Sequence, residues 1–187
     1  MKSILILSSL MLAFCTAVHA QTERELRQEA IAITQAFVAQ LKPELKNAMQ
    51  TKGPSHAIEV CASRAPHIAD ALSSESGWQV SRVSLNQRNA SRATPDKWER
   101  GVLQQFDTLQ AQGVEVAQLN HEELADGRYR FMQAQLVEPV CLVCHGENRS
   151  DEVKATLQQY YPDDVAVGYS LGQVRGAVSL SKNLQQK

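Results

Sequence analysis

The segment Cys141-Leu142-Val143-Cys144-His145 carries the strongest chemical signal in this chain of 187 residues. Two cysteines separated by two residues and followed at once by a histidine form the attachment sequence of a covalent c-type haem. The two thiols would form thioethers with neighbouring vinyl groups of the porphyrin, and His145 would supply an axial nitrogen to the iron. The sequence therefore predicts one covalent haem c, held by Cys141 and Cys144.

Two other roles of a Cys-x-x-Cys pair fit this sequence less well. A closed zinc site needs a second pair of ligands at comparable spacing, and the sequence has no second Cys-x-x-Cys and no His-x3-His. A thioredoxin-type dithiol follows a strand in an early βαβ unit, whereas this pair lies near the C-terminus. Haem attachment is the interpretation that we retain.

The N-terminus has the parts of a secretory signal peptide: Lys2, the apolar run 4–14 and the small-residue site Val18-His19-Ala20. The apolar run is too short to span a bilayer. We therefore expect a signal peptide at residues 1–20 and a single domain at 21–187 without a membrane span. Because c-type haem is attached outside the bacterial cytoplasm, we expect a periplasmic protein.

The charges exclude some classes of partner. The chain has 19 basic and 20 acidic residues, and only Lys2 of these lies in the predicted signal peptide. A balance this close to neutral argues against a nucleic-acid or anionic-membrane partner. No hydrolytic triad or phosphate-binding loop is recognisable either.

Several residues are candidates for the iron ligand opposite His145. A class I cytochrome c takes a methionine from downstream of its motif, and no methionine follows Cys144 here. Cys61 is the cysteine left over in residues 21–187, and on a helix it would share the apolar side of Ile58. The iron position opposite His145 either stays open or is filled by one of the candidate ligands Cys61, His56, His67, His121, Met49 and Met132.

The remaining sequence predicts an α+β domain. A capping box at Thr22 opens a long helix that Pro43 kinks or ends. A second helix follows Gly53-Pro54; it is capped by Ser55, disturbed at Pro66 and ends at Gly77. Two more helices are predicted, one from Thr94 and Pro95 to Gly113 and one at 151–161. The strand signals are 78–85 with a bulge between Val80 and Val83, then 114–119, 128–137 after the turn Asp126-Gly127, and 174–180. The stretch 120–123 is expected to be a polar loop.

The sequence resembles a known family, the exported c-type haem domains with a PAS-like fold, long catalogued as a domain of unknown function. The resemblance covers most of the mature chain. It rests on Ala57-Ile58-Glu59-Val60-Cys61, Ala65-Pro66, Ser76-Gly77-Trp78, Val80-Ser81-Arg82, Arg88-Asn89, Trp98-Glu99 and Cys141 to His145. Ala90 departs from the pattern, which has a proline after Arg88-Asn89.

This resemblance implies a PAS-like antiparallel sheet flanked by helices, with His145 and Cys61 as the axial iron ligands. Arg88 lies in a polar loop that the resemblance marks, and its guanidinium suits carboxylates, so we expect it near the haem propionates. Related domains occur as extracellular sensor modules of histidine kinases and chemoreceptors.

The expected function is therefore redox or small-gas sensing, with nitric oxide or carbon monoxide as the gas. The alternative is a low-potential single-electron carrier that meets a redox partner protein. An enzyme such as a peroxidase ranks third, since Cys61 would close the distal position that catalysis needs. We accordingly expect no enzymatic activity.

Overall fold

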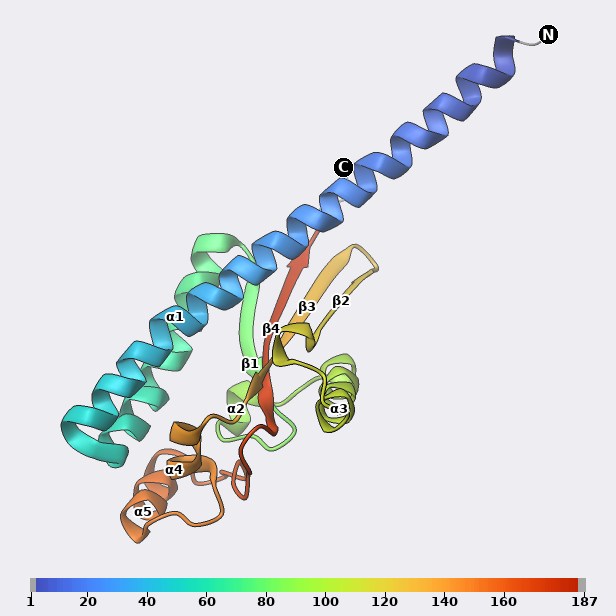
Figure 1. Ribbon diagram of the computed structural model, residues 1–187. Coiled ribbons are helices and arrows are strands. Elements are labelled where there is room, and N and C mark those ends of the chain that lie inside the picture. The colour runs from blue at the N-terminus through green and yellow to red at the C-terminus, as the bar shows by residue number, and fades with distance from the viewer. Residues whose placement is uncertain (1–2, 185–187) are drawn as a thin grey trace.

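The computed structural model describes residues 3–184, with side chains from Glu23 onward. Its helices and strands are, in chain order, α1 (Ser3–Ser76), β1 (Gln79–Val83), α2 (Ala90–Ala93), α3 (Lys97–Ala111), β2 (Asn120–Ala125), β3 (Arg128–Leu136), α4 (Leu142–His145), α5 (Asp151–Tyr160) and β4 (Val174–Asn183) (Figure 1). Two 3-10 turns, η1 (Val116–Gln118) and η2 (Pro139–Cys141), precede β2 and α4. The predicted α+β class with a long N-terminal helix is confirmed.

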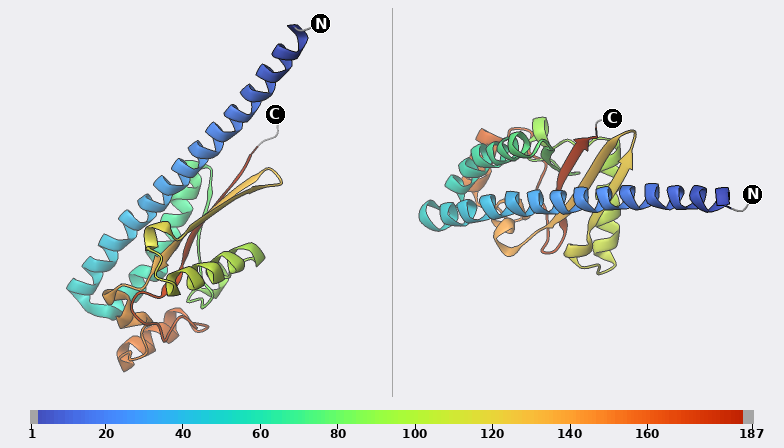
Figure 2. Two further views of the ribbon diagram at one scale, coloured as in Figure 1. Left: turned by 45° about the vertical axis from the view of Figure 1, so that its right-hand side comes forward. Right: turned by 90° about the horizontal axis from the view of Figure 1, so that it is seen from above.

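The four strands form one antiparallel sheet in the order β1-β4-β3-β2. Helix α1 covers one face of this sheet and α3 the other (Figure 2). The turn between β2 and β3 consists of Asp126 and Gly127, which both have positive φ angles, 52° and 70°. Such a two-residue turn matches the twist of the strands that it joins, as the Asp-Gly pair predicts.

Helix α1 consists of two arms, residues 3–52 and 54–76, that meet at Gly53. The backbone of Gly53 is not helical (φ 82°, ψ −174°), and Pro54 follows it. A positive φ favours glycine, so the predicted break at this dipeptide is confirmed. The arms fold back beside each other, as Figure 1 shows, and Arg64 on the second arm pairs with Glu44 on the first at 2.7 Å.

Other predicted limits of α1 are wrong. The helix already includes Thr22, and it continues through Pro43 and Pro66. A proline removes one backbone hydrogen bond, a loss that well-anchored neighbouring turns can tolerate. Around Pro43 the buried Leu41 and Ala48 provide that anchorage.

Ser55 does not cap the second arm. Its hydroxyl instead donates a hydrogen bond of 2.6 Å to Glu152 on α5. The side chain therefore joins two helices, and Pro54 begins the arm without it. The predicted end of this arm is confirmed, since α1 stops at Ser76 and Gly77 has a φ of 73°.

The predicted signal peptide, residues 1–20, lies outside the described side chains. The backbone is helical from Ser3, and cleavage after Ala20 stays a prediction. Among the described residues, no helix combines the length and the apolar character needed to cross a membrane.

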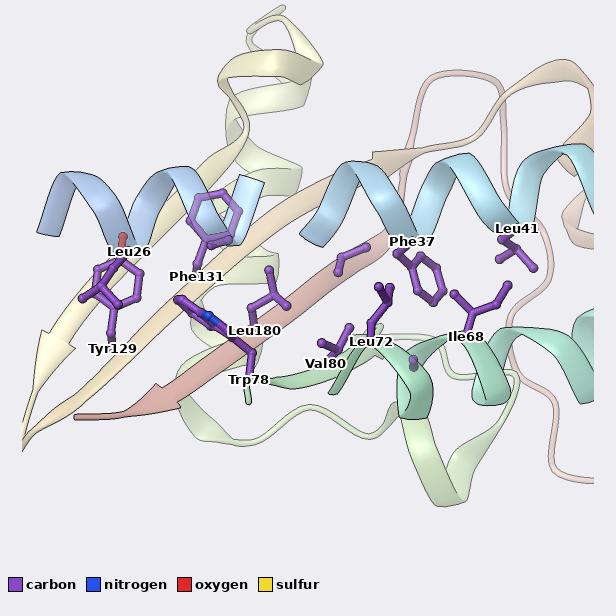
Figure 3. Packing of buried hydrophobic residues seen from close by; sticks show 13 residues of the cluster. Leu26, Phe37, Leu41, Ile68, Leu72, Trp78, Val80, Tyr129, Phe131 and Leu180 are labelled. Atoms are coloured by element: carbon purple, nitrogen blue, oxygen red, sulfur yellow. The ribbon is translucent and has the colours of Figure 1, made fainter. Parts of the chain in front are cut away.

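The sheet buries both of its faces. Phe37, Leu72, Trp78 and Phe131 belong to the core beneath α1 (Figure 3), and a second core lies under α3.

Val80 belongs to the first core and Val83 to the second, because side chains three apart on a strand point to opposite faces. This explains the shift in apolar phase without a bulge there, and the predicted bulge is wrong. The register shift lies between Gln135 and Leu136 instead.

Three predictions in and after α3 are also wrong. Asp96 rather than Thr94 caps the helix, in a reciprocal capping box with Glu99. Residues 114–119 include the turn η1 instead of a strand, and the expected polar loop is the strand β2. Since β2 is at the edge of the sheet, its exposed charged side chains are compatible with strand pairing.

Candidate functional site

The Cys-x-x-Cys-His segment follows β3 at the end of the sheet where α5 and the turn of α1 also lie (Figure 1). Cys141 ends η2, while Cys144 and His145 are in α4. Three residues are close to one helical turn, so the two cysteines lie on neighbouring positions of one helical face. All three side chains are half-buried.

A cavity of about 330 Å³ adjoins this segment. Its walls come from both arms of α1, from β1, from the ends of β3 and β4, and from η2 and α4. The predicted site residues that line it are Cys61, Arg88, Cys141, Cys144 and His145. The cavity thus brings together the attachment segment, the preferred second ligand and the expected propionate contact.

Only some of the candidates for the second iron ligand line the described cavity. Cys61 on the second arm of α1 and Met49 on the first both line it. The remaining candidates are absent from the described lining: His56, His67, His121 and Met132.

Each of these four side chains has other surroundings. His56 contacts Glu59 at 2.9 Å, and His67 is exposed. His121 packs against the ring of Trp98, with centroids 5.8 Å apart. Met132 is fully buried in the core under α3.

Burial favours the neutral form of two thiols in the cavity, those of Cys61 and Cys144. Burial raises the pKa of Cys61, an effect that the nearby Arg82 and Arg88 oppose. Burial likewise raises the pKa of Cys144. Cys61 and both motif cysteines are free in this structure, so all three are available for bonding.

The shorter of two contacts at Nδ1 assigns the tautomer of the His145 ring. Its Nδ1 lies 2.8 Å from the carbonyl oxygen of Ala166, which can only accept, so Nδ1 carries the proton. Arg175 Nε lies 3.0 Å from Nδ1 and 3.4 Å from Nε2. A protonated Nδ1 cannot accept from Arg175, and Nε2 therefore presents the lone pair.

His145 is also held uncharged. Burial, reinforced by the positive charges of Arg175 and Arg88, lowers its pKa well below the usual value. Neutral imidazole is the form that binds metals. The side chain thus offers Nε2 as a ready metal ligand.

Positive charge accumulates around the cavity. Arg88 pairs with Asp164, but neither Arg82 nor Arg175 has a carboxylate partner among the described residues. Burial lowers the pKa of Arg82, and burial together with Arg82 lowers that of Arg175 to about 10. Such a cluster favours a ligand that carries negative charge.

Three further residues at the site, Arg175, Asp164 and Tyr161, were not predicted from the sequence. Arg175 had a recognisable signal, because it is a charge near the start of the strand β4, between Val174 and Gly176. Tyr161 is a buried residue of the cavity wall, where burial and Cys61 raise the pKa of its phenol to about 12. Asp164 follows α5 in a polar stretch that gives no such signal.

The donor set of this cavity fits a c-type haem. Paired thiols, a neutral imidazole and a third thiol border an apolar space, and two arginines beside it have no carboxylate partner among the described side chains. The two propionates of a haem could compensate that charge. Fold and site together define an α+β domain that holds a cysteine- and histidine-lined cavity between a helical hairpin and a sheet.

The chain belongs to the Tll0287-like family, described as Tll0287, which it matches over residues 10–182. The crystal structure of the cyanobacterial haem protein Tll0287 is similar to it, with a TM-score of 0.64 at 23% sequence identity. That likeness covers 89% of this chain and 98% of the other. It confirms the fold expected from the family resemblance. No curated protein matches the chain.

Proposed function

We propose that this chain binds one haem c through thioethers to Cys141 and Cys144, with His145 Nε2 and Cys61 Sγ as axial ligands. The observation that carries the proposal is that Cys61, far away in the sequence, lines the same cavity as the attachment segment. The similar crystal structure is that of a haem protein, and this likeness supports the proposal.

The other cavity residues would hold and shield the cofactor. Arg88 lines the cavity and would contact a propionate. Arg175 Nε lies 3.0 Å from Nδ1 and 3.4 Å from Nε2 of His145, so this side chain would have to leave Nε2 free for the iron. Buried apolar residues of α1 such as Phe37 and Leu41 would exclude water from the ring.

We propose redox or small-gas sensing in the periplasm as the function, without enzymatic activity. Bound haem would supply a one-electron couple and, where the bond to Cys61 opens, a coordination position for nitric oxide or carbon monoxide. A thiolate is a negative donor that favours ferric iron. Cys61 would therefore control both the potential and the access of gas.

A low-potential electron carrier is the second candidate, and one observation favours it. Val140 and Val143, beside the two motif cysteines, are 41% and 38% exposed. Apolar side chains near the attachment point would suit contact with a redox partner protein. Fast electron exchange without gas binding to the ferrous protein would favour the carrier, and gas binding that displaces Cys61 would favour the sensor.

Mass spectrometry of the exported protein tests the covalent haem. After extraction with acidic acetone, the chain should keep the mass of one haem and begin at Gln21. Cys141→Ala/Cys144→Ala should lose the haem, whereas the control Cys61→Ala should retain it, because Cys61 forms no thioether. A wild-type chain without haem and with free thiols at 141 and 144 would overturn the proposal.

A further inference from the structure

Arg88 and Asp164 form an ion pair that joins the loop after β1 to the loop after α5. Their charged groups are 3.1 Å apart, and the side chains are only 11% and 7% exposed. Removing charges from water is costly unless the remaining donors and acceptors are also satisfied. The other contacts of both side chains therefore matter.

Arg88 also reaches the attachment segment. Its Nη2 donates to the carbonyl of Cys144 and, at 3.3 Å, to that of Ala166. A short helix such as α4 leaves its last carbonyls without partners inside the helix. Arg88 supplies a donor to one of them, and the backbone N–H of Tyr169 donates to the carbonyl of His145 at 3.0 Å.

Asp164 fixes the same short loop from its other side. Its Oδ1 accepts the backbone N–H of Ala166 at 2.8 Å. Ala166 is thus held at its N–H by Asp164 and at its carbonyl by Arg88, and it is fully buried. That carbonyl is the acceptor of the His145 ring.

We infer that Arg88 and Asp164 are positioning residues, which set the orientation of His145 by holding the carbonyl of Ala166. The inference rests on the proposed function, because it concerns the ligand that His145 would supply. The acceptor on the second nitrogen of a metal-bound histidine sets its ring orientation and basicity. Because Arg88 shares this acceptor, the pair adjusts how strongly His145 donates to iron.

Arg88→Lys tests positioning without a change of charge. A lysine ammonium cannot reach Asp164, Cys144 and Ala166 together, as the planar guanidinium does. We expect the variant to keep its covalent haem and its low-spin ferric state but to show shifted EPR g-values. Unchanged g-values and potential in this variant would overturn the inference.

Asp164→Asn tests the other residue of the Arg88–Asp164 pair. Loss of the carboxylate removes a buried negative charge beside the site, which should raise the reduction potential. We expect at least a tenfold higher ratio of ferrous to ferric protein at a fixed ambient potential, equivalent to about 59 mV for one electron.

The control is Asp163→Asn, which removes the same charge from the exposed neighbouring residue. It should leave the potential and the g-values close to those of the wild type. Equal shifts in the two asparagine variants would refute positioning by Asp164. The two members are tested separately, so either variant suffices if the other does not fold. A wild type without covalent haem would refute the proposed function instead.

Discussion

Met49 and Cys61 line one cavity from the two arms of α1, on either side of the break at Gly53. The hairpin thus brings two side-chain sulfur atoms of different character to the cavity. A thiolate is negatively charged, whereas a thioether is neutral and raises the potential of a haem. If haem binds as proposed, the choice between these two sulfur atoms as iron ligand would set its potential.

Met49 is predicted to replace Cys61 when the thiol is removed. Cys61→Ala should recruit Met49 rather than His56, because His56 does not line the cavity. Optical and near-infrared spectra should then show a His/Met haem, and Cys61→Ala/Met49→Leu should be high-spin. Met49→Leu alone is the control and should keep the thiolate spectrum. A low-spin double variant would show that another residue binds.

Gly176→Ala is predicted to destabilise the wall of the cavity. Gly176 has a φ of 152°, and a Cβ there would lie 2.4 Å from the carbonyl oxygen of Val83 on the neighbouring strand. We expect a loss of about 1–3 kcal/mol in the free energy of unfolding, measured by denaturant titration. Gly101→Ala is the control, since a Cβ in that exposed helical position meets nothing within 4 Å. It should stabilise the fold by up to about 1 kcal/mol.

Glu29 is predicted to stabilise the protein above acidic pH only. Hydrogen bonds from Lys182 and then from Trp78 lower the pKa of this carboxyl below its ordinary value of 4.5. A lowered pKa means that the stabilisation is complete above 4.5 and disappears as the pH falls through the lowered value.

Comparison with Glu29→Gln should therefore show a difference in unfolding free energy at pH 7 that vanishes in strong acid. Because the Glu29 side chain is half exposed, we expect the difference to stay below about 1 kcal/mol. Denaturant titrations of both proteins at several pH values measure it. A difference that is constant with pH would contradict the role of the charged carboxylate.

Local chemistry made much of the fold predictable. The break at Gly53-Pro54, the turn Asp126-Gly127 and the end of α3 near Gly113 need backbone conformations that few residues adopt, so their positions can be recognised from the sequence. Predictions failed where tertiary packing determines the local backbone conformation. Pro43 stays inside a helix, and an expected polar loop pairs as the edge strand β2.

The candidate site was predictable to a similar degree. The attachment segment has a spacing that its chemistry requires, and the family resemblance singled out Cys61 and Arg88. The roles inferred for Asp164 and Arg175 depend on loops and strands that meet only in the folded chain. The sequence therefore indicates the candidate ligands better than the residues that would position them.

A redox-poised EPR and optical titration of the wild type beside Cys61→Ala decides whether Cys61 binds the iron. The wild type should be low-spin and six-coordinate when ferric, with a thiolate signature and a low potential. Cys61→Ala should keep the covalent haem, lose that signature and rise in potential by roughly a tenth of a volt or more, because a negative donor is gone. Identical spectra and potentials in the two proteins would show that Cys61 does not bind the iron.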